Sequence, residues 1–289
     1  MTNSTAKADA LESLAKGIAQ LTSSDRWTEW LKVQSRFHEY SFSNTVLILV
    51  QRPEATRVTG FNAWRKLNRS VRKGEKAIRI LAPMIYKPTA TQDGPEETEA
   101  CRSVRGFKAV PVFDLSQTDG EELPEVCRRL TGDQLDNTYG HLQSVAHRHG
   151  FTVEEARLGS EINGICDHVL KRIRIETRNS ETQRVKTLAH ELGHAILHNP
   201  CDGDTGSRSL KELEAESVAF VVCRNRDIDT SDYSFGYVAA WAGGSEEAHN
   251  AIRTSGPRIQ RAANEILVAI KEMCPDPMEW ASRSSISTF

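Results

Sequence analysis

Apolar residues in the first part of the chain follow helical spacing first and strand spacing afterwards. A helix near the start is predicted by apolar residues that recur every three or four positions: Leu11, Leu14, Ile18 and Leu21. A second helix is expected around Trp27–Tyr40. Strand-like segments begin at Ala77–Ala82 after a turn at Gly74. Tyr86 and Phe107–Val112 are the expected arms of a hairpin around an acidic loop, Pro88–Cys101.

The second part of the chain mixes the same two patterns. A helix is expected from about Ser180 to His198, where Ser180 and Gln183 make a capping box. Before it, Val169–Glu176 alternates in part between apolar and charged residues, which predicts a strand. A closing helix with one apolar face is expected from about Pro257 to Met273.

Length and composition fit two globular domains. A chain of 289 residues is long enough for two cores, and 38% hydrophobic with 26% charged residues is typical of globular proteins. The polar, acidic segment Ser116–Pro124 is the expected linker. The predicted fold class is therefore α+β, with domains at residues 1–118 and 119–289.

Location is predicted from three features of the sequence. The N-terminal residues lack the apolar core of a signal peptide, and no hydrophobic run is long enough to cross a bilayer. The six cysteines are widely spaced and form no Cys-x-x-Cys pair, which favours reduced thiols. We therefore expect a cytoplasmic protein with no membrane partner.

The most informative chemistry lies in residues 190–194, His-Glu-Leu-Gly-His. Residues four apart share one face of a helix, so His190 and His194 can hold one cation together. Glu191 is placed to act as general base on a metal-bound water. The alternative is that both are ordinary surface histidines. The regular helix predicted around them makes this alternative the weaker one.

A site with two histidines needs a third protein ligand, with water in the fourth position if the site is catalytic. Glu214 has apolar residues four positions before and after it, and such a carboxylate is costly to bury unless it meets a cation. It is the expected third ligand, and pairing with a buried arginine is the alternative. Glu212 is typical of a solvated face, and Glu216 is intermediate. His198 is expected at the helix C terminus, turned about 80° from the first histidine.

The His190–His194 motif followed by residues 214–220, Glu-Ala-Glu-Ser-Val-Ala-Phe, resembles the ImmA/IrrE type of gluzincin metallopeptidase. The resemblance implies that His190, His194 and Glu214 bind zinc and that Glu191 is the base. Manganese or cobalt can replace zinc in such a nitrogen and oxygen site. The resemblance also implies that strand 169–176 is the sheet edge along which a substrate peptide lies, although a purely structural strand is equally compatible with the pattern.

Stabilisation of the oxyanion is not assigned by the sequence. Hydrolysis of a peptide needs a donor for the developing negative charge, besides the metal. Tyr233 and Tyr237 are available for that task, and packing roles are the alternative for both.

The segment Arg57–Arg79 is strongly basic. It carries eight cations and one acid, Glu75, and therefore a net charge of +7 against −2 for the whole chain. The cations are Arg57, Arg65, Lys66, Arg69, Arg72, Lys73, Lys76 and Arg79. Phe61 and Trp64 lie among them. Clustered cations with flat side chains suit single-stranded DNA, in which charges follow phosphates and rings stack on bases. A solvated basic face with aromatic residues in the core is the alternative.

The pattern around this segment resembles the N-terminal domain of ArdC-type antirestriction proteins, a domain that binds single-stranded DNA. The resemblance rests on the stretches at residues 40–44, 51–58, 60–67, 71–76, 80–83 and 106–115, and it resumes at 234–244. ArdC proteins join this domain to an ImmA/IrrE-like metallopeptidase domain, which is the order found here. The acidic insert 88–101 is a departure from the pattern.

These observations predict an antirestriction-type protein that binds single-stranded DNA and is also a zinc metalloendopeptidase with an unknown protein substrate. Two alternatives stay open. One is a regulatory metalloprotease that cleaves a repressor, and the other is a pure single-strand binder with a structural metal. Structural zinc sites are usually closed sets rich in cysteine, which weighs against the last alternative.

Overall fold

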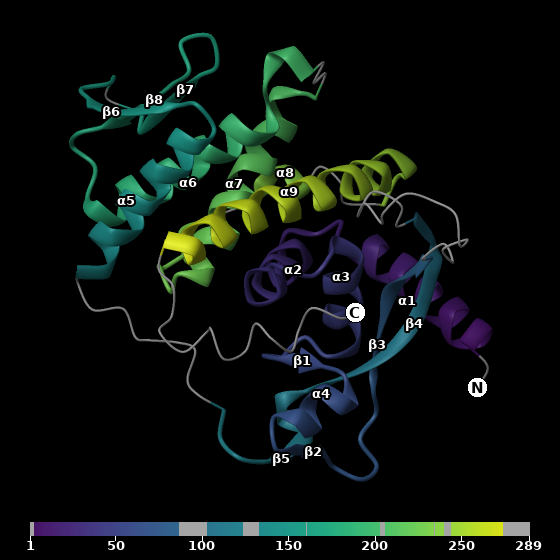
Figure 1. The fold of residues 1–289 in the computed structure, drawn as a ribbon. Coiled ribbons are helices and arrows are strands. Elements are labelled where there is room, and N and C mark those ends of the chain that lie inside the picture. Colours follow the sequence, from purple (N-terminus) through teal and green to yellow (C-terminus); the bar gives the residue numbers. More distant parts are fainter. Residues whose placement is uncertain are drawn as a thin grey trace, which may run out of the picture. The chain divides into compact units, whose positions relative to one another are not determined.

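The computed structural model describes residues 3–86, 103–123, 133–159, 161–202, 206–233, 235–239 and 244–273. The chain forms two compact units, Met1–Glu125 (unit 1) and Val126–Phe289 (unit 2), and both combine helices with small sheets (Figure 1). The α+β fold class is thus confirmed. The boundary expected between residues 118 and 119 falls inside strand β5 (Thr118–Gly120), which pairs with β2 (Arg69–Val71), so the units divide further along the chain. The expected acidic loop Pro88–Cys101 lies outside the described residues.

Unit 1 begins with three helices and continues with short strands. Its elements are α1 (Asn3–Gln20), α2 (Ser24–Arg36), α3 (Phe42–Gln51), β1 (Val58–Thr59), α4 (Phe61–Lys66), β2, β3 (Ile78–Tyr86), β4 (Ser103–Asp114), a 3-10 turn (Leu115–Gln117) and β5. The two early helices and the β3–β4 hairpin confirm the predictions, although α2 ends before Tyr40. Helix α3 is not expected from the sequence, because its run of buried apolar residues hides the helical period.

Side-chain amides from α3 cover the free edge of β3. Asn44 Nδ2 donates to Leu81 O at 3.0 Å, and Asn44 Oδ1 accepts from Leu81 N at 2.9 Å. Gln51 makes the same pair of bonds with Arg79, at 2.9 and 2.8 Å. Because the sheet order β1-β4-β3 leaves β3 at an edge, these bonds prevent it from pairing with another chain.

Unit 2 places a small sheet against a set of helices. Its elements are α5 (Asp133–Arg148), β6 (Thr152–Ala156), β7 (Gly164–Asp167), β8 (Arg172–Glu176), α6 (Glu181–Leu197), a 3-10 turn (Pro200–Asp202), α7 (Arg208–Asn225), α8 (Gly236–Ala239) and α9 (Glu246–Met273). Helix α6 packs on α5 and α7, and α7 packs on α9 (Figure 1). The closing helix starts well before Pro257, which lies inside it. No helix among the described residues is both long and apolar enough to span a membrane.

Strand β8 is the central strand of its sheet, not an edge. The order is β6-β8-β7, with β6 parallel and β7 antiparallel to β8. The alternation of residues 172–175 is confirmed, because Ile173 and Ile175 are fully buried. The expectation that this strand forms the sheet edge is wrong. A strand paired on both sides has no free backbone groups for a peptide, and within the described residues the two edges of this sheet are β6 and β7.

Helix α6 begins as its cap predicts and approaches α7 very closely. Ser180 Oγ accepts a hydrogen bond from Gln183 N at 3.2 Å. At Gly193 the two helices are so near that an added Cβ would lie 2.9 Å from Ala215 Cα and 3.3 Å from its Cβ. Glycine inside a helix costs about 1 kcal/mol relative to alanine. The contact with α7 explains why glycine is nevertheless suitable here.

Two glycine-to-alanine substitutions in unit 2 should change stability in opposite directions. Gly193→Ala should lower the free energy of unfolding by about 1–3 kcal/mol, because overpacking forces α6 and α7 apart. Gly140→Ala, in α5, should raise it by about 1 kcal/mol, because an added Cβ meets no atom within 4 Å. Urea unfolding followed by circular dichroism measures both. Equal stabilisation by the two substitutions would contradict the close helix contact.

Candidate metal centre

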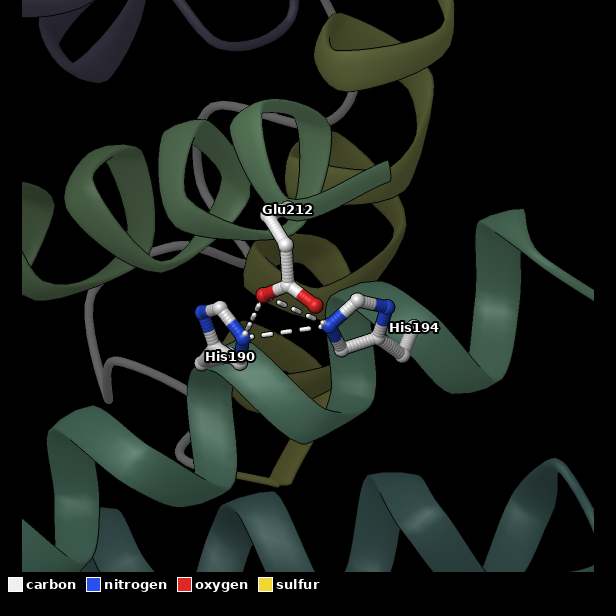
Figure 2. Close-up of side chains that lie close together, drawn as sticks. All are labelled: His190, His194 and Glu212. Atoms are coloured by element: carbon white, nitrogen blue, oxygen red, sulfur yellow. Dashed lines mark hydrogen bonds and ion pairs between the residues drawn. The ribbon is translucent and has the colours of Figure 1, made fainter. Parts of the chain in front are cut away.

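Three ligand atoms from two helices converge in unit 2. His190 Nε2 and His194 Nε2, both from α6, lie 3.1 Å apart. Glu212 Oε2, from α7, lies 3.4 Å from the first nitrogen and 3.5 Å from the second. Figure 2 shows the carboxylate reaching across from its helix toward both rings. Two imidazole nitrogens and one carboxylate oxygen at this separation are a suitable donor set for a divalent metal.

A second carboxylate from α7 orients the first imidazole. Glu216 follows Glu212 by one helical turn, and its Oε2 lies 3.0 Å from His190 Nδ1. A carboxylate on Nδ1 keeps the proton on that atom and leaves Nε2 available as a ligand. Two glutamates one helical turn apart on α7 therefore contact the two ring nitrogens of one histidine. Glu212 lies near His190 Nε2, and Glu216 contacts His190 Nδ1.

The structure does not bring Glu214 to this cluster. Its side chain is buried on another face of α7, where Oε2 lies 2.9 Å from His198 Nε2 and Arg258 Nε lies 3.1 Å from Oε1. The geometry therefore shows the alternative, an arginine partner, although Arg258 is half-buried and only Glu214 is buried. An apolar stripe identifies the face of α7 that is buried in the core, whereas the face toward His190 and His194 carries the partly exposed Glu212. The signal missed in the sequence is the 212–216 pair of acids at helical spacing.

Glu191 lies beside the cluster, against edge strand β7. The backbone N–H of Cys166 donates a hydrogen bond to its carboxylate. Burial raises the pKa of Glu191 to about 7, and the carboxylate of Glu212 adds to the rise while His190 opposes it. An added Cβ on Gly164 would lie 2.7 Å from Glu191 Oε1, so glycine is required for this close approach. A carboxylate with a pKa near neutral can accept and release a proton at physiological pH.

Charges around His190 favour a cation. Burial by itself would lower the pKa of the His190 imidazole. The carboxylates of Glu212 and Glu216 outweigh it, so the pKa of His190 is raised to about 10. The same negative field that holds a proton on this ring would stabilise a metal ion between the ligand atoms.

The cluster opens into a cleft of about 770 Å³ whose lining includes β7, Lys186 and Tyr233. The ammonium of Lys186 lies 2.6 Å from Asp232 Oδ1. The Tyr233 hydroxyl contacts Cys223 Sγ at 3.7 Å, and burial raises its pKa. Tyr233 therefore uses its hydroxyl inside the core, which favours the packing role. The side chain of Tyr237 lies outside the described part of the chain.

The basic segment of unit 1 divides into structural and exposed residues. Trp64 is only 1% exposed and its Nε1 donates to Phe113 O at 2.9 Å, so it cannot stack on a base. Arg69 donates to Thr118 Oγ1 at 2.8 Å and also to the backbone carbonyls of residues 118, 120 and 121. Arg72 pairs with Glu75 at 2.9 Å. These three side chains hold the fold of the segment together.

The remaining side chains of the segment differ in exposure. Arg57 and Arg79 are half-buried, whereas Arg65, Lys66, Lys73 and Lys76 are exposed. Phe61 is 47% exposed and lies edge-on to Phe113. Gln117 fixes the turn at residues 72–76, because its Nε2 donates to Lys76 O at 2.8 Å and to Glu75 Oε2 at 2.9 Å. Exposed cations on a fixed turn and on the neighbouring helix α4 remain available to an anionic partner.

Comparison with known families matches both units. Residues 9–113 match the N-terminal domain of anti-restriction factor ArdC. Residues 146–226 match the IrrE N-terminal-like domain of the M78 peptidases. The chain therefore joins an ArdC-like N-terminal domain to an IrrE-like second domain. The metal cluster and the basic segment each lie within one of these domains.

One relative and two solved structures are similar to this chain at low identity. An uncharacterized protein of Bacillus anthracis is 26% identical over 275 residues, covering 81% of this chain and 47% of the relative, so the chain spans about half the relative's length. Crystal structures of an antirestriction ArdC protein from the R388 plasmid share the fold. The metal-free structure has a TM-score of 0.52 at 21% identity, covering 81% of this chain and 86% of that one. The Mn(II)-bound structure has a TM-score of 0.55 at 20% identity, covering 89% and 97%.

Removal of the Glu212 carboxylate should show whether this acid of α7 is the third metal ligand. Glu212→Ala should lower affinity for Mn²⁺ or Zn²⁺ by at least about 100-fold, since even outer-shell changes cost 10–100-fold. Chelator competition measures the affinity. Glu161→Ala is the matched control, because Glu161 lines the same cleft and is exposed. Equal affinities of the two variants would exclude Glu212 as a ligand.

Proposed function

We propose that unit 2 holds a divalent metal through His190, His194 and Glu212. The single observation that carries this proposal is the convergence of their three ligand atoms within 4.8 Å of one another. Three protein ligands of this kind leave one coordination position for water, as in catalytic zinc sites. Manganese in the similar R388 protein supports a divalent ion, and zinc, manganese and cobalt all suit the donor set.

We further propose that this site is a metallopeptidase centre. A bound divalent ion would polarise a peptide carbonyl and make its water more acidic. Glu191 takes the proton of the attacking water and later transfers it to the leaving amine. Burial has already brought the pKa of Glu191 to about 7, close to the pH at which both steps must occur. Glu216 keeps the proton of His190 on Nδ1 throughout the reaction.

Strand β7 is the proposed docking edge for the substrate. One side of β7 pairs with β8, and within the described residues no strand pairs with the other side. Gly164, Ile165 and Cys166 of this strand line the cleft. An extended peptide can add to such an edge through backbone hydrogen bonds. Its carbonyls would then pass close to Glu191, which lies against Gly164.

The substitution Glu191→Gln tests the peptidase proposal. It should abolish cleavage of casein or of a peptide library, by at least about 100-fold, because an amide cannot accept the proton. Binding of Mn²⁺ or Zn²⁺ should remain, since Glu191 is not among the ligands. Zinc analysis after dialysis and mass spectrometry of the peptides give the two readouts. Cleavage at the wild-type rate would exclude Glu191 as the base.

For unit 1 we propose binding of single-stranded DNA. The proposed contacts are Arg65, Lys66, Lys73 and Lys76, with Phe61 as the stacking residue. These side chains are exposed, and the turn that carries two of them is fixed by Gln117. Cations would neutralise phosphates while the ring stacks on an unpaired base. Together the two units would make an antirestriction-type protein that binds DNA and cleaves a protein. Free thiols at Cys166, Cys201 and Cys223 support a location in the reducing cytoplasm.

A charge-neutralised variant tests the DNA proposal by fluorescence anisotropy. Changing Arg65, Lys66, Lys73 and Lys76 to Gln should weaken binding of a labelled single-stranded oligonucleotide and lower its salt slope by up to about 3. The matched control changes Lys7, Lys16, Arg26 and Lys32, on α1 and α2, to Gln. A control that loses as much affinity as the variant would show that only total charge matters. Absence of binding by the wild type at low salt would contradict the proposal altogether.

A further inference from the structure

We infer that His198, Glu214 and Arg258 form a hydrogen-bonded relay that fixes the tautomer of His194 and thereby makes its Nε2 a metal ligand. The three are positioning residues, since none of them reaches the ligand cluster. The inference rests on the proposed metal site for its consequence, although the relay itself can be tested without metal.

The relay is a continuous series of short contacts across three helices and the C-cap of α6. His194 Nδ1 lies 2.9 Å from Nδ1 of His198, the C-cap of α6. His198 Nε2 lies 2.9 Å from Glu214 Oε2 on α7. Arg258, on α9, donates from Nε to both Glu214 oxygens at 3.1 and 3.2 Å, and from Nη2 to Leu197 O at 2.7 Å. The side chains of His198 and Glu214 are each only 4% exposed.

The chemistry of the groups sets the direction of every hydrogen bond. Glu214 accepts hydrogen bonds from Arg258 Nε at both carboxylate oxygens, so it is an acceptor toward His198 as well. His198 Nε2 must therefore donate to it. An imidazole that donates from one ring nitrogen can accept at the other, so His198 Nδ1 is the acceptor in its 2.9 Å contact with His194 Nδ1. His194 Nδ1 must donate to that acceptor, which leaves the lone pair of His194 Nε2 directed at the ligand cluster.

Both proposed ligand histidines are thus held with the proton on Nδ1, but by different partners. His190 donates from Nδ1 directly to the carboxylate of Glu216. His194 has no carboxylate in that position and reaches one through the imidazole of His198. A metal-binding histidine needs its outer nitrogen protonated so that the inner one can coordinate. The relay therefore explains why a charged side chain as buried as Glu214 is present at all, because its burial without such partners would be costly.

The substitution Glu214→Gln should reverse the direction of the hydrogen bonds that link residue 214, His198 and His194. Arg258 would donate to the amide oxygen, and the amide NH₂ would face His198 Nε2, which must then accept. His198 would carry its proton on Nδ1, and His194 would be driven to the Nε2–H tautomer, which cannot coordinate. Affinity for Mn²⁺ should fall by about 10–100-fold, as for other outer-shell changes.

Nitrogen-15 NMR of histidine-labelled, metal-free protein reads the tautomers directly. The wild type should show His194 protonated on Nδ1 and His198 on Nε2, and Glu214→Gln should show both exchanged. If that variant does not fold, His198→Phe keeps a ring but removes both nitrogens, and it should give mixed His194 tautomers with at least about a tenfold loss of Mn²⁺ affinity.

Three outcomes separate the relay from the metal site. Wild-type His194 protonated on Nε2 would overturn the relay. So would a folded Glu214→Gln variant that binds Mn²⁺ as tightly as the wild type while the wild type binds it well. Correct tautomers in a wild type that binds neither Mn²⁺ nor Zn²⁺ would support the relay and contradict the proposed function.

Discussion

The close approach of helices α6 and α7 at Gly193 is the constraint on which the rest of unit 2 depends. An added Cβ there would meet the backbone of Ala215 at 2.9 Å, so the helices lie almost backbone to backbone. At that distance the histidine row of α6 faces the carboxylate row of α7. Glu212 then reaches both ligand nitrogens, and Glu216 reaches the outer nitrogen of His190. A wider spacing would leave two histidines without a third ligand.

The three acids of α7 contact different partners because they lie on different faces of the helix. Glu212 and Glu216 share the face toward His190, whereas Glu214 points toward His198 and Arg258. The outcome is a cluster in which ligands and orienting groups come from neighbouring turns of the same helix. Glu191, whose pKa burial has raised to about 7, completes it from the side of strand β7. A buried carboxylate with a pKa near neutral beside the proposed ligands weighs against a purely structural metal, which would need no proton acceptor.

Sequence patterns predicted the elements of the site better than its contacts. The helix at 181–197, its Ser180 cap and the pairing of His190 with His194 follow from spacing alone. Which acid of α7 faces the two histidines depends on how α7 is rotated about its axis relative to α6. Hydrophobic spacing shows only which face of α7 is buried. For the same reason Glu214 stands out in the sequence, because a carboxylate in an apolar stripe signals a buried partner without identifying it.

Charge patterns in unit 1 had a similar limit. The density of cations at residues 57–79 is visible in the sequence, but their partners are not. Arg69 and Arg72 are bound by groups that follow more than forty positions later, such as Thr118 and Ser116. Trp64 is buried against β4, whereas Phe61 is exposed. Only tertiary structure separates the cations that stabilise the fold from those that remain available to an anionic partner.

Anomalous diffraction from crystals soaked with Mn²⁺ or Zn²⁺ would test the central claim most directly. The ion should lie about 2.0–2.2 Å from His190 Nε2, His194 Nε2 and a carboxylate oxygen of Glu212, with Glu214 still bound to His198 and Arg258. An ion coordinated by Glu214 in place of Glu212, or no anomalous peak between the two histidines, would contradict the claim that the α6–α7 contact builds the metal site.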